Sequence, residues 1–432
     1  MLKRPGKSER RIHAGDATTR LLARIAFLYW FIWMTEALIG LRLFGDNLPF
    51  SRLIPFLFAL TVLFIQAGRG KAMHWSGAAK WILFYFLWAG CSLVWSTASD
   101  IGLSVWVWIM FGAELLFVCL TMSCPIDREA VLKSTFAGLV AGGACMSLQV
   151  ISIFQPGADL KSQDGLHPNF MGHRIAIAAL CALYLWSQNR RSVWAIGLPL
   201  LVIALFLTTS KGALIAFLFF ALLFVFSPQN RLSRRRKLQV VALLVVISAI
   251  ALQFVGRAFH VYEAKGGADT LSGRAVLWVQ VIPKILIRPF VGYGFASFAD
   301  NWPANRWYTG QAHNELLQQW FTLGLIGVTL LALTYWKLFR ALWRSTSDSS
   351  RFGIYLLGYC LVRGFVEADD SHVILALLFC FSLNPRARSS LARARRPNLR
   401  RPRGAPEKST CLPAGPAPSE APSIDLTTCS KS

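Results

Sequence analysis

The sequence predicts an all-α polytopic membrane protein with about twelve transmembrane helices and one long periplasmic loop that contains amphipathic helices. Composition is the first reason: 55% of the 432 residues are hydrophobic and 15% are charged, against about 45–50% and about 25% in soluble domains. The second is a series of apolar segments that approach the roughly 20 residues needed to cross a bilayer. The third is the concentration of Lys and Arg in every other link between them.

The apolar segments define the predicted elements in order. The predicted spans occupy residues 21–44, 51–67, 79–96, 101–123, 131–154, 172–187, 192–209, 211–227, 238–255, 315–336, 352–366 and 371–384. Several are short or contain Gly and Pro, which tilting or kinking of the helix accommodates. The first is about as long as a full crossing and many others follow it, so no cleavable signal peptide is expected.

The basic residues set the predicted orientation. They gather in the N-terminus, in every second link and in the C-terminal tail, and all of these lie on one side if the twelve spans are threaded in turn. Because cytoplasmic segments are enriched in Lys and Arg, both ends are predicted to be cytoplasmic. The longest loop then lies on the opposite, outward-facing side of the membrane.

This topology divides the chain into parts: a basic N-terminus (1–20), spans one to nine (21–255), the long periplasmic loop (256–314), spans ten to twelve (315–384) and a tail (385–432). The tail is rich in Arg, Pro, Ala and Ser, so it cannot bury a core and is expected to be disordered, its basic half lying on anionic lipids as an accessory. The net charge of +24 is spread over short loops between apolar stretches, so nucleic acid is not an expected partner.

Neither cysteines nor histidines indicate a metal or a disulfide framework. The nine cysteines contain no CxxC pair, and none lies in the long loop. His167 and His173 are six residues apart, which suits one helical face poorly, and no carboxylate accompanies them at the next turn. No cofactor and no metal site are therefore expected.

The long loop contains one predicted helix. The stretch "SGRAVLWVQVIPKILIRP" begins at Ser272, a suitable N-cap, and places Leu277, Val281 and Leu286 where they can share an apolar face. Pro283 is expected to kink this helix. Such a helix either rests at the membrane surface or roofs a cavity. The "RPFVGYGF" that follows turns on two glycines, and Arg288 at its start is a candidate substrate-binding residue.

Two cations stand where a negatively charged ligand could be held. Lys211, in the tight link "TTSKG" between two spans, is a candidate anion contact at a half-buried site; a loop lysine whose chain reaches the surface is the alternative. Arg274 opens the predicted loop helix, where free N–H groups and the guanidinium fork both suit phosphate oxygens. A solvated loop arginine is the alternative there.

The stretch "TGQAHNELLQQWFTLGLIG" places an imidazole at the mouth of the tenth span. His313 can take up a proton near neutral pH, so it is a candidate general base, with an interfacial or capping histidine as the alternative. Asn314 is a candidate N-cap as well as a substrate contact, and Glu315 suits the first turn of the helix. Gln318 and Gln319 carry polarity one turn deeper.

Two further polar groups remain. "HPNFMGHR" supplies His167, Asn169, His173 and Arg174, for which substrate contact is the favoured role. For Arg174 the alternative is a residue at the outer edge of a span. At the end of the eleventh span, Arg363 and Glu367 are four residues apart. We expect that pair to be structural, with a contribution to the cavity as the lesser alternative.

In their order and placement, the Ser-Lys-Gly turn, the Ser-Gly-Arg helix start, "RPFVGYGF" and "HNELLQQWFTLGLIG" resemble the O-antigen ligase/polymerase family, over roughly residues 155–336. The resemblance implies an inverting, metal-independent glycosyltransferase on the periplasmic face of a bacterial inner membrane. Its donor would be a glycan on undecaprenyl pyrophosphate and its acceptor a saccharide or a lipid-linked glycan. It further implies that Arg274 contacts the pyrophosphate and that His313 is the base. Lys211 stands where the family more often has arginine, which keeps the charge but loses the bidentate fork.

Within this resemblance, an exopolysaccharide or O-antigen polymerase is favoured over a ligase, because no element for recognising a lipid A-core acceptor is evident. The alternative functional class is a transporter, such as a flippase of lipid-linked sugars. Twelve spans with both ends in the cytoplasm suit a transporter equally well. Transporters often show repeated halves with broken helices at the midplane. The sequence has no evident internal repeat and its polar residues concentrate in outer loops, which favours the enzyme.

Overall fold

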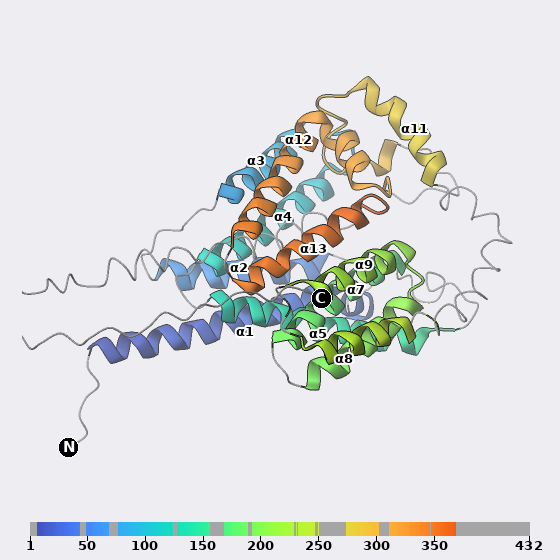
Figure 1. Ribbon diagram of the computed structural model, residues 1–432. Helices are drawn as coiled ribbons and strands as arrows, with labels where there is room; N and C mark the ends of the chain where they lie inside the picture. The colour runs from blue at the N-terminus through green and yellow to red at the C-terminus, as the bar shows by residue number, and fades with distance from the viewer. Residues whose placement is uncertain are drawn as a thin grey trace, which may run out of the picture. The chain divides into compact units, whose positions relative to one another are not determined.

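The computed structural model describes residues 7–43, 49–68, 77–123, 128–155, 168–188, 192–228, 230, 232–246, 249, 274–301, 311–345 and 347–368. Within them the regular secondary structure is helical throughout and contains no strand (Figure 1). The helices are α1 (Lys7–Leu43), α2 (Pro49–Ala67), α3 (Gly77–Ser92), α4 (Ile101–Ser123), α5 (Arg128–Ile153), α7 (Pro168–Gln188), α8 (Ser192–Leu207), α9 (Lys211–Phe226), α11 (Arg274–Ile287), α12 (Glu315–Arg344) and α13 (Asp348–Gly364). Residues 234–246 are also helical, and short 3₁₀ turns occupy Leu93–Trp95 and Ala299–Asn301.

Each predicted span except the last overlaps one of these helices, and α4 has the predicted ends. The last, 371–384, and the tail lie outside the described residues. The helix predicted in the long loop is α11, although its predicted cap, Ser272, is not among the described residues. The predicted apolar face is correct for Leu277 and Val281, which pack inward, and wrong for Leu286, which is 64% exposed on the other side of the helix. The local apolar patterns therefore predicted the helices well.

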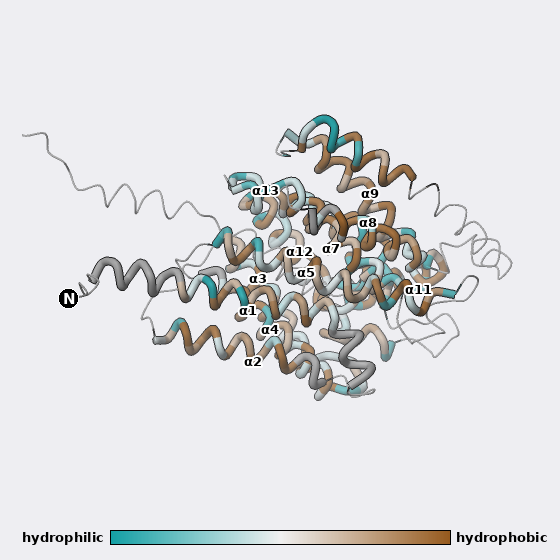
Figure 2. The backbone as a smooth tube through the Cα atoms, turned by 90° about the horizontal axis from the view of Figure 1, so that it is seen from below, coloured by the Kyte–Doolittle hydropathy of each residue, from teal (hydrophilic) through white to brown (hydrophobic). Residues whose placement is uncertain are grey.

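Among the described residues, five segments are long and apolar enough to cross a membrane: Ala78–Trp95, Ile101–Cys119, Arg128–Ile153, Pro168–Gln188 and Glu315–Arg344. Shorter apolar helices cover Leu53–Ala67, Ile196–Leu207 and Lys211–Phe226. Apolar residues dominate most of these helices (Figure 2). The described part of the chain is thus a polytopic helical membrane protein, with fewer full-length spans than the twelve predicted.

Helix α7 lies at the centre of the packing. Every residue from Met171 to Leu185 is buried, and α7 contacts α5, α8, α9 and α13. The neighbouring pair α1 and α5 packs closely because α5 presents glycines to α1. A Cβ on Gly138 would lie 2.3 Å from the carbonyl oxygen of Phe27, and one on Gly142 would lie 2.5 Å from Cβ of Met34. Small residues let membrane helices approach in this way.

Helix α12 is broken at Gly324, which has a φ of +67°. The segment 289–294 enters the break and replaces the lost helical hydrogen bonds. The backbone N–H of Tyr293 donates to the carbonyl of Phe321 at 2.9 Å, and the N–H of Leu325 donates to the carbonyl of Pro289 at 2.8 Å. Broken membrane helices persist where neighbouring groups satisfy the freed backbone in this manner.

The glycines of "RPFVGYGF" make this insertion possible. Gly292 has a φ of +66°, and a Cβ on it would lie 2.6 Å from the backbone nitrogen of Gly324. Gly294 has a φ of +97°, and a Cβ on it would lie 2.2 Å from Cα of Ser96. Only glycine combines this conformation with so close a backbone approach. The predicted turn on two glycines is therefore a docking segment that joins α11 rigidly to α12.

The same loop is also fastened to the end of α3. The N–H of Thr97 donates to the carbonyl of Tyr293 at 2.9 Å, and the N–H of Phe295 donates to Oγ of Ser92 at 3.0 Å. The carboxylate of Asp300 accepts from the backbone and the hydroxyl of Ser99 at 2.9 and 2.8 Å. Residues 289–301 thus have a defined place against two membrane helices.

Candidate functional site

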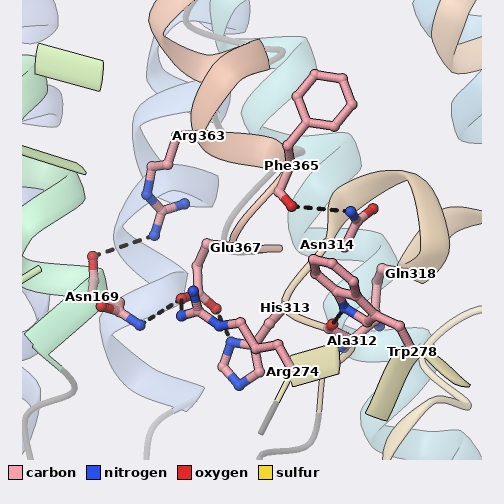
Figure 3. A network of polar contacts seen from close by, with 10 residues as sticks. All are labelled: Asn169, Arg274, Trp278, Ala312, His313, Asn314, Gln318, Arg363, Phe365 and Glu367. Carbon is pink, nitrogen blue, oxygen red and sulfur yellow. Dashed lines mark hydrogen bonds and ion pairs between the residues drawn. The ribbon is translucent and has the colours of Figure 1, made fainter. Parts of the chain in front are cut away.

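Glu367, just beyond the C-terminal end of α13, is the centre of a polar network (Figure 3). Its Oε1 contacts Nδ1 of His313. Its Oε2 accepts from Nη2 of Arg274 at 3.0 Å and from Nδ2 of Asn169 at 2.5 Å. One carboxylate therefore brings together the end of α13, the start of α7, the start of α11 and the residue that precedes the cap of α12.

Glu367 is ionised in this setting. Only 3% of its surface is exposed, and burial raises the pKa of its carboxyl. The hydrogen bond and charge of His313, with the charges of Arg363 and Arg274, outweigh burial and hold that pKa below its ordinary value of 4.5. An ionised carboxylate only accepts hydrogen bonds, so Nδ1 of His313 carries the proton. The basic nitrogen of the neutral imidazole is then Nε2.

The backbone holds His313 in an unusual conformation. Its φ is +50°, a region that side-chain-bearing residues seldom occupy and that often marks functional positions. The neighbours keep it there: the N–H of Ala312 donates to Oε1 of Gln318 at 2.7 Å, and Nε1 of Trp278 donates to the carbonyl of Ala312 at 2.9 Å. His313 is 6% exposed, so its ring position is determined from several sides.

Asn314 is the N-cap of α12, as predicted. Its Oδ1 accepts from the N–H of Leu317 at 3.0 Å, and Glu315 follows in the first turn. Its Nδ2 donates to the carbonyl of Phe365 at 3.0 Å. Asn314 therefore connects the start of α12 to the segment that carries Glu367, and substrate binding by this residue stays a prediction.

Arg274 reaches the site because α11 packs on the first part of α12. Val281 and Ile285 are buried against Phe298 and Phe321, and Figure 1 shows α11 beside the start of α12. Among the described residues, Glu367 is the hydrogen-bond partner of Arg274. The side chain is 21% exposed, and a guanidinium has five N–H donors. Further donors are thus available to a ligand.

Lys211 lies in a turn that packs against the same segment. A Cβ on Gly212 would lie 2.7 Å from Cγ2 of Val366, the residue before Glu367. Thr209 in this turn has a φ of +56°, and Lys211 itself is exposed at the start of α9. The turn that carries the second predicted cation is therefore next to the network, while anion binding by Lys211 remains a prediction.

The other predicted residues fall outside the network in different ways. The guanidinium of Arg174 is buried, donates to the carbonyl of Trp33 and stacks on Trp33 and Phe170, at 4.4 and 3.9 Å from the ring centroids. Arg288 lies over Tyr293, 5.1 Å from the ring centroid. His167 is outside the described residues. For these three, substrate contact is still a prediction.

Glu367 was not predicted as a site residue. The sequence predicted a structural pair of Arg363 and Glu367, yet Glu367 contacts both predicted catalytic residues, His313 and Arg274. Nη2 of Arg363 donates to the carbonyl of Asn169 at 3.3 Å, which supports the start of α7. The only signal in the sequence was an acidic residue directly after an apolar helix.

The geometry suits proton abstraction beside a bound anion. An imidazole with a buried carboxylate on Nδ1 is oriented to accept a proton at Nε2, and the carboxylate stabilises the resulting imidazolium. The same carboxylate forms an ion pair with Arg274, which keeps the positive charge of the guanidinium close to His313. Charge that develops on a leaving group close to Arg274 would be stabilised there.

The chain is similar in sequence to known proteins in two comparisons. Residues 196–332, which include Lys211, Arg274 and His313, match a family model described as O-Antigen ligase. The chain is also 25% identical over 329 residues to the Exopolysaccharide production protein ExoQ of Rhizobium meliloti (strain 1021), an alignment that covers 67% of this chain and 72% of that protein.

Proposed function

On the premise that the chain belongs to the O-antigen ligase/polymerase family, which both similarities support, we propose that this protein is an integral membrane glycosyltransferase. Its donor is a glycan on undecaprenyl pyrophosphate, and its acceptor is the hydroxyl of a saccharide or of a second lipid-linked glycan. The reaction takes place on the periplasmic face of the inner membrane. It extends an exopolysaccharide or O-antigen chain.

The observation that carries the proposal is the sharing of Glu367 by His313 and Arg274. A glycosyl transfer from a pyrophosphate needs a base for the acceptor and a cation for the leaving group. Here one buried carboxylate orients both. The two groups come from the long loop and from the mouth of α12, so a lipid-borne donor and a water-borne acceptor can meet between them.

In the proposed step, Nε2 of His313 removes the proton from the acceptor hydroxyl. The acceptor oxygen forms a bond to the anomeric carbon while the bond from that carbon to the pyrophosphate oxygen breaks, with inversion. The electron pair of the broken bond stays on the polyprenyl pyrophosphate, whose added negative charge Arg274 and Lys211 stabilise. The proton remains on His313, beside Glu367, until it passes to water.

Polymerisation is favoured over ligation for two reasons. The relative named above is described as an exopolysaccharide production protein. The sequence in addition has no evident element for recognising a lipid A-core acceptor. The polyprenyl tail of the donor would lie among the apolar helices, which a soluble enzyme lacks.

The test is incubation of the purified full-length protein in nanodiscs with lipid-linked repeat units, followed by gel analysis of the glycan. A ladder of products longer than one repeat is the expected result. Transfer of preformed polymer to lipid A-core without chain growth would replace polymerase by ligase. Movement of the lipid-linked glycan across a vesicle membrane without any new glycosidic bond would overturn the enzyme in favour of a transporter.

A further inference from the structure

Helix α11 is apolar on two opposite faces. One face, with Val281 and Ile285, is buried against Phe298 and Phe321. The other presents Val276, Val279, Ile282 and Leu286, which are spaced by three or four residues and so share one side of the helix. These side chains are exposed; Val279 is 70% and Leu286 is 64% exposed. An ordinary surface helix would carry polar residues there.

The exposed face continues beyond the helix into the docking segment. Ile287, the last residue of α11, is 72% exposed, and Phe290 and Val291 of the docking segment are 63% and 39% exposed. The apolar surface therefore runs from Val276 through Val291, past the point where the chain enters the break in α12. Contiguous apolar surface of this kind on a protein marks contact with a membrane or a partner.

This surface joins the exposed apolar surface of helices that are long enough to cross a membrane. The N–H of Ile326 donates to the carbonyl of Phe290 at 3.3 Å, and Leu325 and Ile326 of α12 are themselves exposed. On the other side, Nε1 of Trp95 donates to the carbonyl of Val291 at 3.3 Å, next to Val94, which is 89% exposed. The exposed face of α11 thus adjoins exposed apolar residues of two candidate spans, Ala78–Trp95 and Glu315–Arg344.

The length of α11 disfavours a transmembrane orientation. At 1.5 Å per residue, its 14 residues extend about 21 Å, less than the roughly 30 Å of a hydrocarbon core. We propose that α11 lies in the plane of the bilayer, on the side of the membrane that holds His313, with Val276, Val279, Ile282 and Leu286 among the acyl chains. The membrane lipid is the occupant of this face.

The position of α11 in the membrane also sets the depth of Arg274. What this depth means for a bound donor rests on the proposed function, whereas the membrane contact itself does not. Arg274 is the first residue of α11 and points to the buried side, toward Glu367. A helix held at the boundary between headgroups and acyl chains would keep this guanidinium at headgroup depth. The pyrophosphate of a lipid-borne donor could then reach Arg274 without leaving the leaflet.

The experiment measures the collision of spin labels with two relaxation agents in nanodiscs. Each label is attached to a single cysteine in the full chain whose nine native cysteines have been replaced. Oxygen partitions into the bilayer and a nickel chelate stays in water. The test positions are Val279→Cys and Leu286→Cys. Leu148→Cys, an exposed position of the candidate span α5, is the lipid control, and Ala299→Cys, exposed in the loop, is the water control.

Lipid contact predicts an oxygen-to-nickel accessibility ratio at 279 and 286 that matches the ratio at 148 and is several-fold above that at 299. A ratio like that at 299 would overturn the proposal, because the face would then be in water. Low collision with both agents would also overturn it, because protein such as a second copy would then cover the face. Val276→Cys and Ile282→Cys repeat the measurement if either first variant fails to fold, as judged by gel filtration.

The result is independent of glycosyl transfer, since no substrate is present. If the labels lie in lipid and the protein shows no glycosyl transfer, the membrane contact of α11 is supported and the proposed enzymatic function is contradicted. Labels in water combined with an active protein would do the reverse. The two proposals can therefore fail separately.

Discussion

Nδ1 of His313 contacts Oε1 of Glu367, a residue 54 positions later in the chain. Both side chains are buried, and the same carboxylate holds Arg274 through its other oxygen. This pairing decides which ring nitrogen of His313 is basic and where it points. It also makes the base and the cation of the proposed reaction depend on one residue.

Removing the charge of Glu367 is expected to lower transfer strongly. In Glu367→Gln the amide no longer stabilises the imidazolium and no longer neutralises Arg274. Because general base catalysis contributes about 10²–10⁴-fold, we expect the rate at saturating donor to fall by roughly 10²-fold or more. Rates on lipid-linked repeats measure this. Asp300→Asn, in the loop and bonded to Ser99, is the matched control and should retain normal transfer.

His313→Ala and Arg274→Ala are each expected to abolish chain growth while the protein still inserts in the membrane at normal level. The first variant has no base, and loss of one charge-stabilising donor typically costs about 10²–10³-fold in rate. Membrane fractionation and glycan ladders measure the two quantities. Near-normal product from purified His313→Ala protein would eliminate the general base proposed here.

Lys211 is expected to act through its charge. Lys211→Arg should be tolerated, because it keeps the cation and adds a fork suited to phosphate. Lys211→Ala should instead raise the donor concentration needed for half-maximal rate. Lys133→Ala, which removes an exposed cation paired with Glu129 on α5, is the control for net charge. Equal donor dependence in all four proteins would show that Lys211 is a surface lysine.

Gly324→Ala is expected to destabilise the protein. A Cβ there would lie 2.1 Å from the carbonyl oxygen of Phe290, and the φ of +67° disfavours any side chain. A side chain in this region of positive φ costs about 1–3 kcal/mol, and the clash adds to it, so the thermal midpoint in nanodiscs should fall. Gly197→Ala is the control, since its Cβ would meet nothing within 4 Å. An unchanged midpoint for Gly324→Ala would contradict the docking of residues 289–294 in the break.

The stabilisation from Glu367 is expected to disappear in acid. Its folded-state pKa is below the ordinary value of 4.5, so the group stabilises the fold at pH values above 4.5 and loses this contribution as pH falls through the folded pKa. Glu367→Gln cannot titrate. The difference in thermal midpoint between wild type and this variant should therefore be largest near neutral pH and shrink in acid. A difference that grows on acidification would refute this assignment.

Much of the secondary structure and part of the site could be predicted from the sequence. Apolar segments located the helices, because the requirement to satisfy backbone groups in lipid acts on each segment separately. Asn314 was predicted as a cap from its position before an apolar helix, and the structure confirms it. Arg274 and His313 were recognised as candidates from their neighbours in the chain. All of these inferences depend on local chemistry.

The role of Glu367 was decided by the tertiary structure alone. Asn169, Arg274, His313 and Glu367 belong to segments far apart in sequence, and only the packing of α7, α11, α12 and α13 places them around one carboxylate. The break at Gly324 and the segment that fills it are likewise non-local, since each supplies hydrogen bonds that the other lacks. Periodicity and capping report what a residue does within its own helix, whereas a buried charge is stabilised by partners from other helices, which one-dimensional patterns do not contain.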